Sequence, residues 1–141
     1  MSQVIFTIHF VILFFVASLH IYWALGGKMG SLAVLPQTSS EEPIFMPSKF
    51  ITFLVAIAFY IAAFVFGHSA GFFHFSILSN YQTALLIFLA IVFLIRAVGD
   101  FKYVGFAKKM KGTSFATNDS KYYSPLCFMI SITIFLAIYF Q

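Results

Sequence analysis

A few ionisable and aromatic side chains stand out in this chain, because almost everything around them is apolar. Only 9% of the 141 residues are charged, whereas 62% are hydrophobic. Eight side chains near the ends of apolar segments are candidates for holding a ligand: Arg96, Asp100, Lys102, Tyr103, His20, Trp23, Tyr122 and Tyr123. The forked donors of arginine suit carboxylates and phosphates. This group therefore predicts a site for an anionic or phosphate-bearing molecule with an apolar tail.

Arg96 and Asp100 are four residues apart, a spacing that brings two side chains together on a helix. We expect Asp100 to orient Arg96, with Lys102 beside them, so that both cations receive the charge of the ligand. In the alternative interpretation, Arg96 extends to the lipid headgroups and is held there by Asp100. The neighbouring lysines are then only anchors at the membrane surface.

His20 is the candidate for a catalytic group, because imidazole has the one ordinary side-chain pKa near neutrality. As a general acid or base it would act on the headgroup of a lipid-like substrate. A nearby Arg96 would favour its neutral form. In the structural alternative, one ring nitrogen hydrogen-bonds a backbone carbonyl or a serine inside the bundle. Whether the protein is an enzyme stays open.

Three other histidines, His9, His68 and His74, are expected at the opposite end of the bundle, where imidazoles could converge on a metal ion. The pattern is weak, because His68 and His74 lack a recognised ligand spacing and no carboxylate or cysteine joins them. We predict no metal and no cofactor. The single cysteine, Cys127, excludes an internal disulfide and a dithiol relay.

Four long apolar segments must position these side chains. A mean hydropathy of +1.00 and the low charged fraction place the chain in a bilayer, since soluble domains carry about 25% charged residues. The predicted spans cover about residues 4–25, 49–67, 81–103 and 124–140. They predict a single domain, residues 1–141, with an all-α fold: a polytopic membrane protein with four transmembrane helices in an up-and-down bundle.

Local signals predict where these helices begin and end. Ser48 is a plausible N-cap, and Ser124-Pro125 is typical of an N-cap followed by proline at the first helical position. The loop of residues 26–47 is rich in proline and glycine and is longer than a simple connection needs. It either folds back as a lid over the end of the bundle or is disordered.

The basic residues predict the orientation. They lie in or beside the first and third loops: Lys28, Lys49, Lys102, Lys108, Lys109, Lys111 and Lys121. Positive charge stays on the cytoplasmic side, so both loops are expected there and both termini outside. Five of the eight basic residues lie in one loop beside apolar spans, so the net charge of +4 indicates membrane lipids as partners and no nucleic acid.

Small residues at helical spacing predict a packing face on the second span. Ala56, Ala63 and Gly67 share one side of that helix, where they would let a neighbour approach closely. This face could join a helix of the same chain, a partner protein or a second copy. It is the predicted route to a homo-oligomer.

Three segments carry a resemblance to a known family: residues 20–27 (HIYWALGG), residues 96–106 (RAVGDFKYVGF) and residues 123–126 (YSPL). In these segments, and over nearly its whole length, the chain resembles a family of small bacterial integral membrane proteins catalogued as domain of unknown function 3995. The resemblance implies a four-helix protein of the inner membrane. It implies no activity.

Three functions follow as hypotheses. The preferred one is binding of an amphipathic, anionic small molecule or lipid in a pocket at the cytoplasmic end of the bundle, in the inner membrane of a bacterium. It requires Arg96 and His20 to face a common cavity. The second is an accessory or structural protein that assembles with partner helices, and the third is a small oligomeric transporter.

Overall fold

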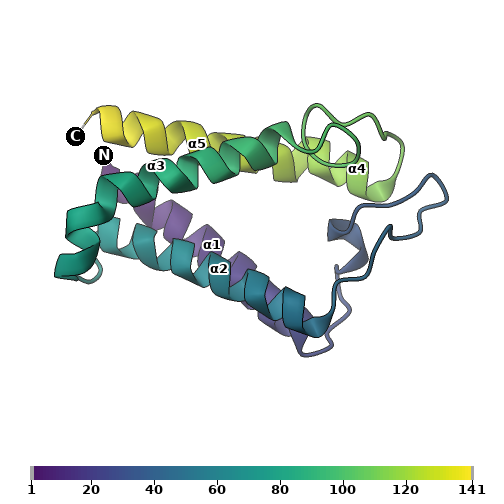
Figure 1. Cartoon of the computed structure of the whole chain (residues 1–141), viewed down its shortest axis with the longest axis horizontal. Coiled ribbons are helices and arrows are strands. Elements are labelled where there is room, and N and C mark those ends of the chain that lie inside the picture. Colours follow the sequence, from purple (N-terminus) through teal and green to yellow (C-terminus); the bar gives the residue numbers. More distant parts are fainter. Residues whose placement is uncertain (1, 141) are drawn as a thin grey trace.

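The computed structural model describes residues 2–140, and its regular secondary structure there is helical (Figure 1). The elements are α1 (Ser2–Ala24), a 3₁₀ turn (Leu32–Val34), α2 (Lys49–Ser69), α3 (Ser76–Val98), α4 (Ser114–Asn118), a π-helical turn (Asp119–Tyr123) and α5 (Ser124–Tyr139). The last three are continuous and form one helix of 26 residues. Together with α1, α2 and α3, it makes four helices long and apolar enough to cross a membrane. The all-α prediction with four spans is confirmed.

The observed helix ends agree with the prediction at Ser48 and differ from it at the end of α3. Ser48 caps α2 as expected, since its hydroxyl accepts a hydrogen bond from the amide of Ile51 at 3.2 Å. The third helix begins at Ser76 and stops at Val98, so the prediction that it continues to residue 103 is wrong. Gly99 ends it with a φ of 89°, a value that no helix accommodates.

The prediction that Ser124 caps the last helix is also wrong. Thr113 is the cap, accepting a hydrogen bond from the amide of Ala116 at 3.0 Å, and the helix then runs through Ser124. Proline lacks an N–H group and its ring crowds the preceding turn. The π-helical turn ends at Tyr123, two residues before Pro125, and is the local widening that lets the helix pass this proline.

The four long helices form two antiparallel hairpins, α1 with α2 and α3 with α5 (Figure 1). The hairpins join at the end that holds both termini. There Phe6 stacks on Phe66 with ring centroids 6.1 Å apart, and His9 Nε2 lies 3.0 Å from the hydroxyl of Thr133. This end contains much of the buried apolar core.

At the opposite end the hairpins diverge. Ala62 and Val65 of α2 are each only 6% exposed, but Ile51 and Leu54, eleven residues earlier on the same faces, are 53% and 47% exposed. The bundle is therefore closed at one end and open between its two hairpins at the other (Figure 1).

A strap, residues 25–48, crosses the open end from α1 to α4 and back to α2 (Figure 1). The buried side chain of Gln37 accepts a hydrogen bond from the amide of Phe115 at 2.9 Å. Tyr123 donates to the carbonyl of Ala33 at 3.3 Å. Of the two alternatives for this loop, the structure shows the ordered lid.

The small-residue face of α2 is used inside the chain. Ala56 and Ala63 are almost fully buried, and the Cα of Gly67 lies so close to Phe10 of α1 that a Cβ there would be 3.1 Å from that ring. This face packs within the α1–α2 hairpin, so a second copy could reach it only if α1 moved. Oligomerisation itself stays a prediction.

Candidate functional site

The basic loop, residues 99–113, connects α3 to α4 and begins with a tight turn around Asp100. Asp100 Oδ1 accepts hydrogen bonds from the amides of Lys102, Tyr103 and Val104 at 2.9, 2.7 and 2.9 Å. Partial desolvation raises the pKa of this carboxyl, but the amide hydrogen bonds outweigh it and hold the pKa below its ordinary value. Asp100 thus organises the backbone of the loop. It does not orient Arg96, and that expectation is wrong because α3 ends before Asp100.

Two glycines let the basic loop fold back onto the end of α3. The amide of Phe106 donates to the carbonyl of Ala97 at 2.8 Å, which brings Gly99 and Gly105 face to face. A Cβ on Gly99 would collide with the carbonyl of Val104, and one on Gly105 with the carbonyl of Val98. The close approach therefore needs glycine at both positions.

Asp100→Ala should loosen the basic loop, because three amides lose their acceptor. The expected cost is about 0.5–1 kcal/mol, at the low end for a lost cap because the carboxyl is exposed. A lowered pKa means that the stabilisation is complete above the ordinary carboxyl pKa of about 4 and is lost as pH falls through the lowered value. Melting curves of both proteins between pH 3 and pH 7 should show a difference at pH 7 that shrinks toward pH 3. A difference independent of pH would contradict this role.

The partner of Arg96 is Asp119, which is fully buried. Its Oδ1 accepts from Arg96 Nη2 at 2.9 Å, and its Oδ2 accepts from Lys108 Nζ at 2.9 Å. The same Oδ2 accepts from the amide of Gly105 at 2.8 Å and from the hydroxyl of Ser124 at 3.1 Å. One carboxylate thus ties the end of α3, the basic loop and the last helix together.

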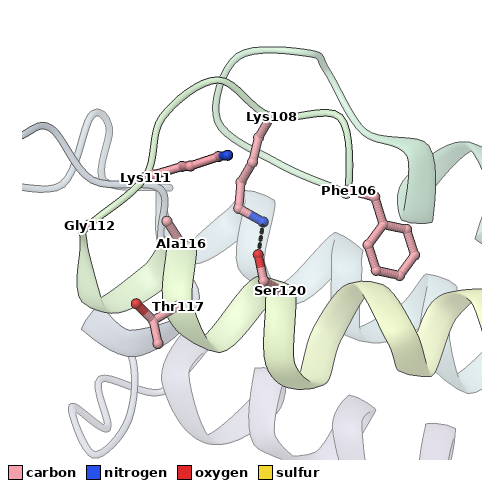
Figure 2. A pocket seen from close by; sticks show the side chains of 7 residues that line it. All are labelled: Phe106, Lys108, Lys111, Gly112, Ala116, Thr117 and Ser120. Atoms are coloured by element: carbon pink, nitrogen blue, oxygen red, sulfur yellow. Dashed lines mark hydrogen bonds between the residues drawn. The ribbon is translucent and has the colours of Figure 1, made fainter.

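This cluster carries more positive than negative charge. Lys108 is almost completely buried, and besides Asp119 it donates to the carbonyl of Gly105 at 2.9 Å and to the hydroxyl of Ser120 at 2.7 Å (Figure 2). Arg96 Nη1 is buried and has no hydrogen-bond partner among residues 2–140. Two cations share one carboxylate, so the cluster has a formal charge of +1.

Sequence reasoning missed Asp119. Two features of the sequence could have pointed to it. The chain has only four acidic residues, and this one lies five positions before Ser124-Pro125, beside an apolar span. An acid so close to the membrane needs a cationic partner. The spacing of Arg96 and Asp100 offered a local partner instead.

His20 and Trp23 lie on the other hairpin and do not meet Arg96. His20 Nδ1 is 2.8 Å from the carbonyl of Val16, and its ring packs on those of Trp23 and Phe59 at 5.0 and 5.2 Å. These contacts are those of the structural alternative. The structure therefore does not bring His20 and Arg96 to a common pocket, because the hairpins diverge at this end.

The remaining predicted ligand residues lie around the same end of the molecule. Lys102 and Tyr122 are exposed, Lys102 Nζ stands 4.9 Å from the centre of the Tyr103 ring, and Tyr123 is bonded to the strap. Neither these residues nor His20 line either of the two hollows described below.

The three histidines at the closed end do not converge. His68 and His74 are adjacent, with ring centroids 5.1 Å apart, but His68 Nε2 lies 3.3 Å from the hydroxyl of Ser79, and His9 pairs with Thr133. Across the described chain, no group of three or more histidine, cysteine or acidic side chains is arranged to hold a metal ion.

Two adjoining hollows lie where the basic loop meets α4. The first, the basic hollow, has a volume of about 220 Å³. It is lined by Phe106, Lys108, Lys111, Gly112, Ala116, Thr117 and Ser120 (Figure 2). The second, the acidic hollow, has a volume of about 260 Å³. It is lined by Glu41, Gly112, Thr113, Ser114, Thr117 and Asn118.

The charge of the whole protein gathers around these hollows. Six of the eight basic residues and two of the four acidic ones lie between Arg96 and Tyr123. This segment therefore carries a formal charge of +4, which equals the net charge of the chain. Anionic groups at the membrane surface will be attracted to this end.

Comparison with known proteins gives a family and no activity. No curated protein and no solved structure matches the chain. A family model described as "Protein of unknown function (DUF3995)" matches residues 13–134. The matched segment contains Arg96, Asp119 and the residues that line both hollows. It leaves out the first turns of α1 and the last residues of α5. The four apolar helices of this chain make it a multi-pass membrane protein, and the chain belongs to the DUF3995 family.

Proposed function

We propose that this protein resides in the cytoplasmic membrane of a bacterium and binds a phosphate-bearing, lipid-like molecule at its basic end. The headgroup lies in the basic hollow and the apolar tail runs along the last helix into the bilayer. The observation that carries the proposal is a basic loop held in a fixed position by a buried carboxylate, Asp119, beside a hollow of about 220 Å³.

The chemistry of the basic hollow suits a phosphate. Lys111 lies at its edge, and its ammonium group has no carboxylate within 4 Å among the residues described. Lysine is a common point-charge partner of phosphate. Lys108 uses its own protons on Gly105, Asp119 and Ser120, so it fixes the hydroxyl of Ser120 as an acceptor and leaves the hydroxyl proton for the ligand.

An apolar path leads from the basic hollow toward the membrane. Phe106 lines the hollow and packs edge-on against Phe128 of α5, with ring centroids 6.2 Å apart. Both side chains are exposed, Phe106 by 54% and Phe128 by 41%. A ligand with an acyl tail would cover them, whereas a free inorganic anion would leave them bare.

The orientation follows from the positive-inside rule. The strap and the basic loop are at one end of the molecule and the termini at the other (Figure 1). Because lysine and arginine collect at the end with the basic loop, we place that end in the cytoplasm and both termini outside.

Lys111→Gln tests the binding site. Affinity for dihexanoyl phosphatidylmethanol, a phosphodiester without an amine, should fall about fivefold in calorimetric titration of the detergent-purified protein, which corresponds to about 1 kcal/mol. The matched control is Lys28→Gln, the same change of charge in the strap and outside both hollows. If both variants weaken binding equally, the effect is general attraction to a positive protein and the hollow is not the site.

A further inference from the structure

We infer that the headgroup carries a primary amine beside its phosphate, so that the phosphate occupies the basic hollow and the ammonium group the acidic hollow at Glu41. This inference rests on the proposed function and adds the chemical class of the headgroup. An ethanolamine phosphodiester has the required pair of charges.

The two hollows are placed to receive one ligand. They share Gly112 and Thr117 in their linings, so they are neighbours on the surface of the protein. Lys108 and Lys111 line one side and Glu41 the other. Opposite charges in two neighbouring hollows complement a zwitterion.

These opposite charges do not neutralise each other. No lysine or arginine nitrogen in residues 2–140 lies within 4 Å of the Glu41 carboxylate, and the two ion pairs found there both belong to Asp119. Within residues 2–140, the one side-chain hydrogen bond of Glu41 comes from the hydroxyl of Ser114 at a long 3.4 Å. Separate, unpaired charges favour a ligand that bridges them.

The strap holds Glu41 at the hollow in an uncommon conformation. Its φ is 62°, a left-handed value that residues other than glycine and asparagine adopt rarely. The turn is closed by hydrogen bonds from the amide of Thr38 to the carbonyl of Glu42 at 2.8 Å and from the amide of Glu41 to the carbonyl of Thr38 at 3.0 Å. Glycine would adopt this conformation with less strain.

The test compares two variants with two lipids and one soluble headgroup. Glu41→Gln removes the charge at the acidic hollow, and Glu42→Gln makes the same change one residue away, outside both hollows. Each protein is titrated calorimetrically with dihexanoyl phosphatidylethanolamine, dihexanoyl phosphatidylmethanol and free O-phosphoethanolamine. We expect Glu41→Gln to weaken binding of the ethanolamine lipid about fivefold and to leave binding of the methanol lipid unchanged or slightly tighter. Glu42→Gln should bind both lipids as the unmodified protein does.

The outcomes separate this inference from the proposed function. Equal loss for both lipids in Glu41→Gln, or no loss for either, overturns the amine site while phosphatidylmethanol binding still supports the phosphate site. Failure of the unmodified protein to bind either lipid overturns both. Equal affinity for O-phosphoethanolamine and for the ethanolamine lipid supports the headgroup chemistry and overturns the lipid-like ligand.

Discussion

Asp119→Asn is expected to destabilise the protein by about 3–5 kcal/mol, the usual cost of removing one partner from a buried ion pair. The change leaves Lys108 buried without a counter-charge, and it also removes the charge that holds Arg96 Nη2. The amide of asparagine offers one oxygen in place of two, so at least one of the present donors also loses its acceptor. The basic loop, α3 and the last helix lose their common anchor.

Thermal unfolding in detergent measures this effect, and the midpoint should fall by roughly 10 °C. The matched control is Glu42→Gln, an exposed acid whose loss should shift the midpoint by no more than about 1 °C. The double variant Asp119→Asn, Lys108→Met should recover part of the loss, because no ammonium group is then buried without a partner. A single variant that melts with the unmodified protein would show that the cluster does not hold the loop.

Gly99→Ala is expected to cost about 3 kcal/mol or more. The φ of 89° and ψ of −165° at this position lie in a region that is essentially restricted to glycine, and the added methyl group would collide with the carbonyl of Val104. The turn around Asp100 would have to open, and with it the amide of Gly105 would move away from Asp119. Loss of this turn should expose the lysines of the basic loop.

Gly112→Ala is the matched control for this prediction. Gly112 also has a positive φ, of 86°, but a Cβ there would meet no atom within 4 Å, so only about 1 kcal/mol of backbone strain is expected. Limited trypsin digestion followed by mass spectrometry should show early cleavage after Lys102 or Lys109 in Gly99→Ala and not in Gly112→Ala. Equal cleavage of the two variants would mean that the close approach of Gly99 and Gly105 contributes little.

The four spans could be predicted from the sequence because a bilayer admits few alternatives for long apolar segments. The cap at Ser48 was also readable, since it depends on residues three positions apart. The end of α3 was not, because the predicted span of residues 81–103 and the four-residue spacing of Arg96 and Asp100 suggested one continuous helix. Gly99 ends the helix before that pattern does, and the reason is a contact with residue 104 that no local periodicity reports.

The sequence predicted where the basic site lies, but it did not predict which side chains form ion pairs there. The cluster of basic residues and Arg96 at one end of the bundle was visible in the sequence, and the structure places them there. The partner of Arg96 is 23 residues away, and it is reached only because the basic loop folds back on α3. The expectation of a pocket shared by His20 and Arg96 assumed that the four helices pack together along their whole length, whereas the two hairpins separate at that end.

The two hairpins are joined at one end of the molecule and separate toward the other. The contacts between the hairpins lie near the termini. A small change in the angle between the hairpins at His9 and Thr133 would therefore give a larger change in the distance between their opposite ends. The strap is connected covalently to the α1–α2 hairpin at both of its ends, and Gln37 binds it to α4 of the other hairpin. The strap therefore limits the distance between the two hairpins at this end. Shortening or cleaving the strap would change the distance between the two hairpins without altering the contacts within either one.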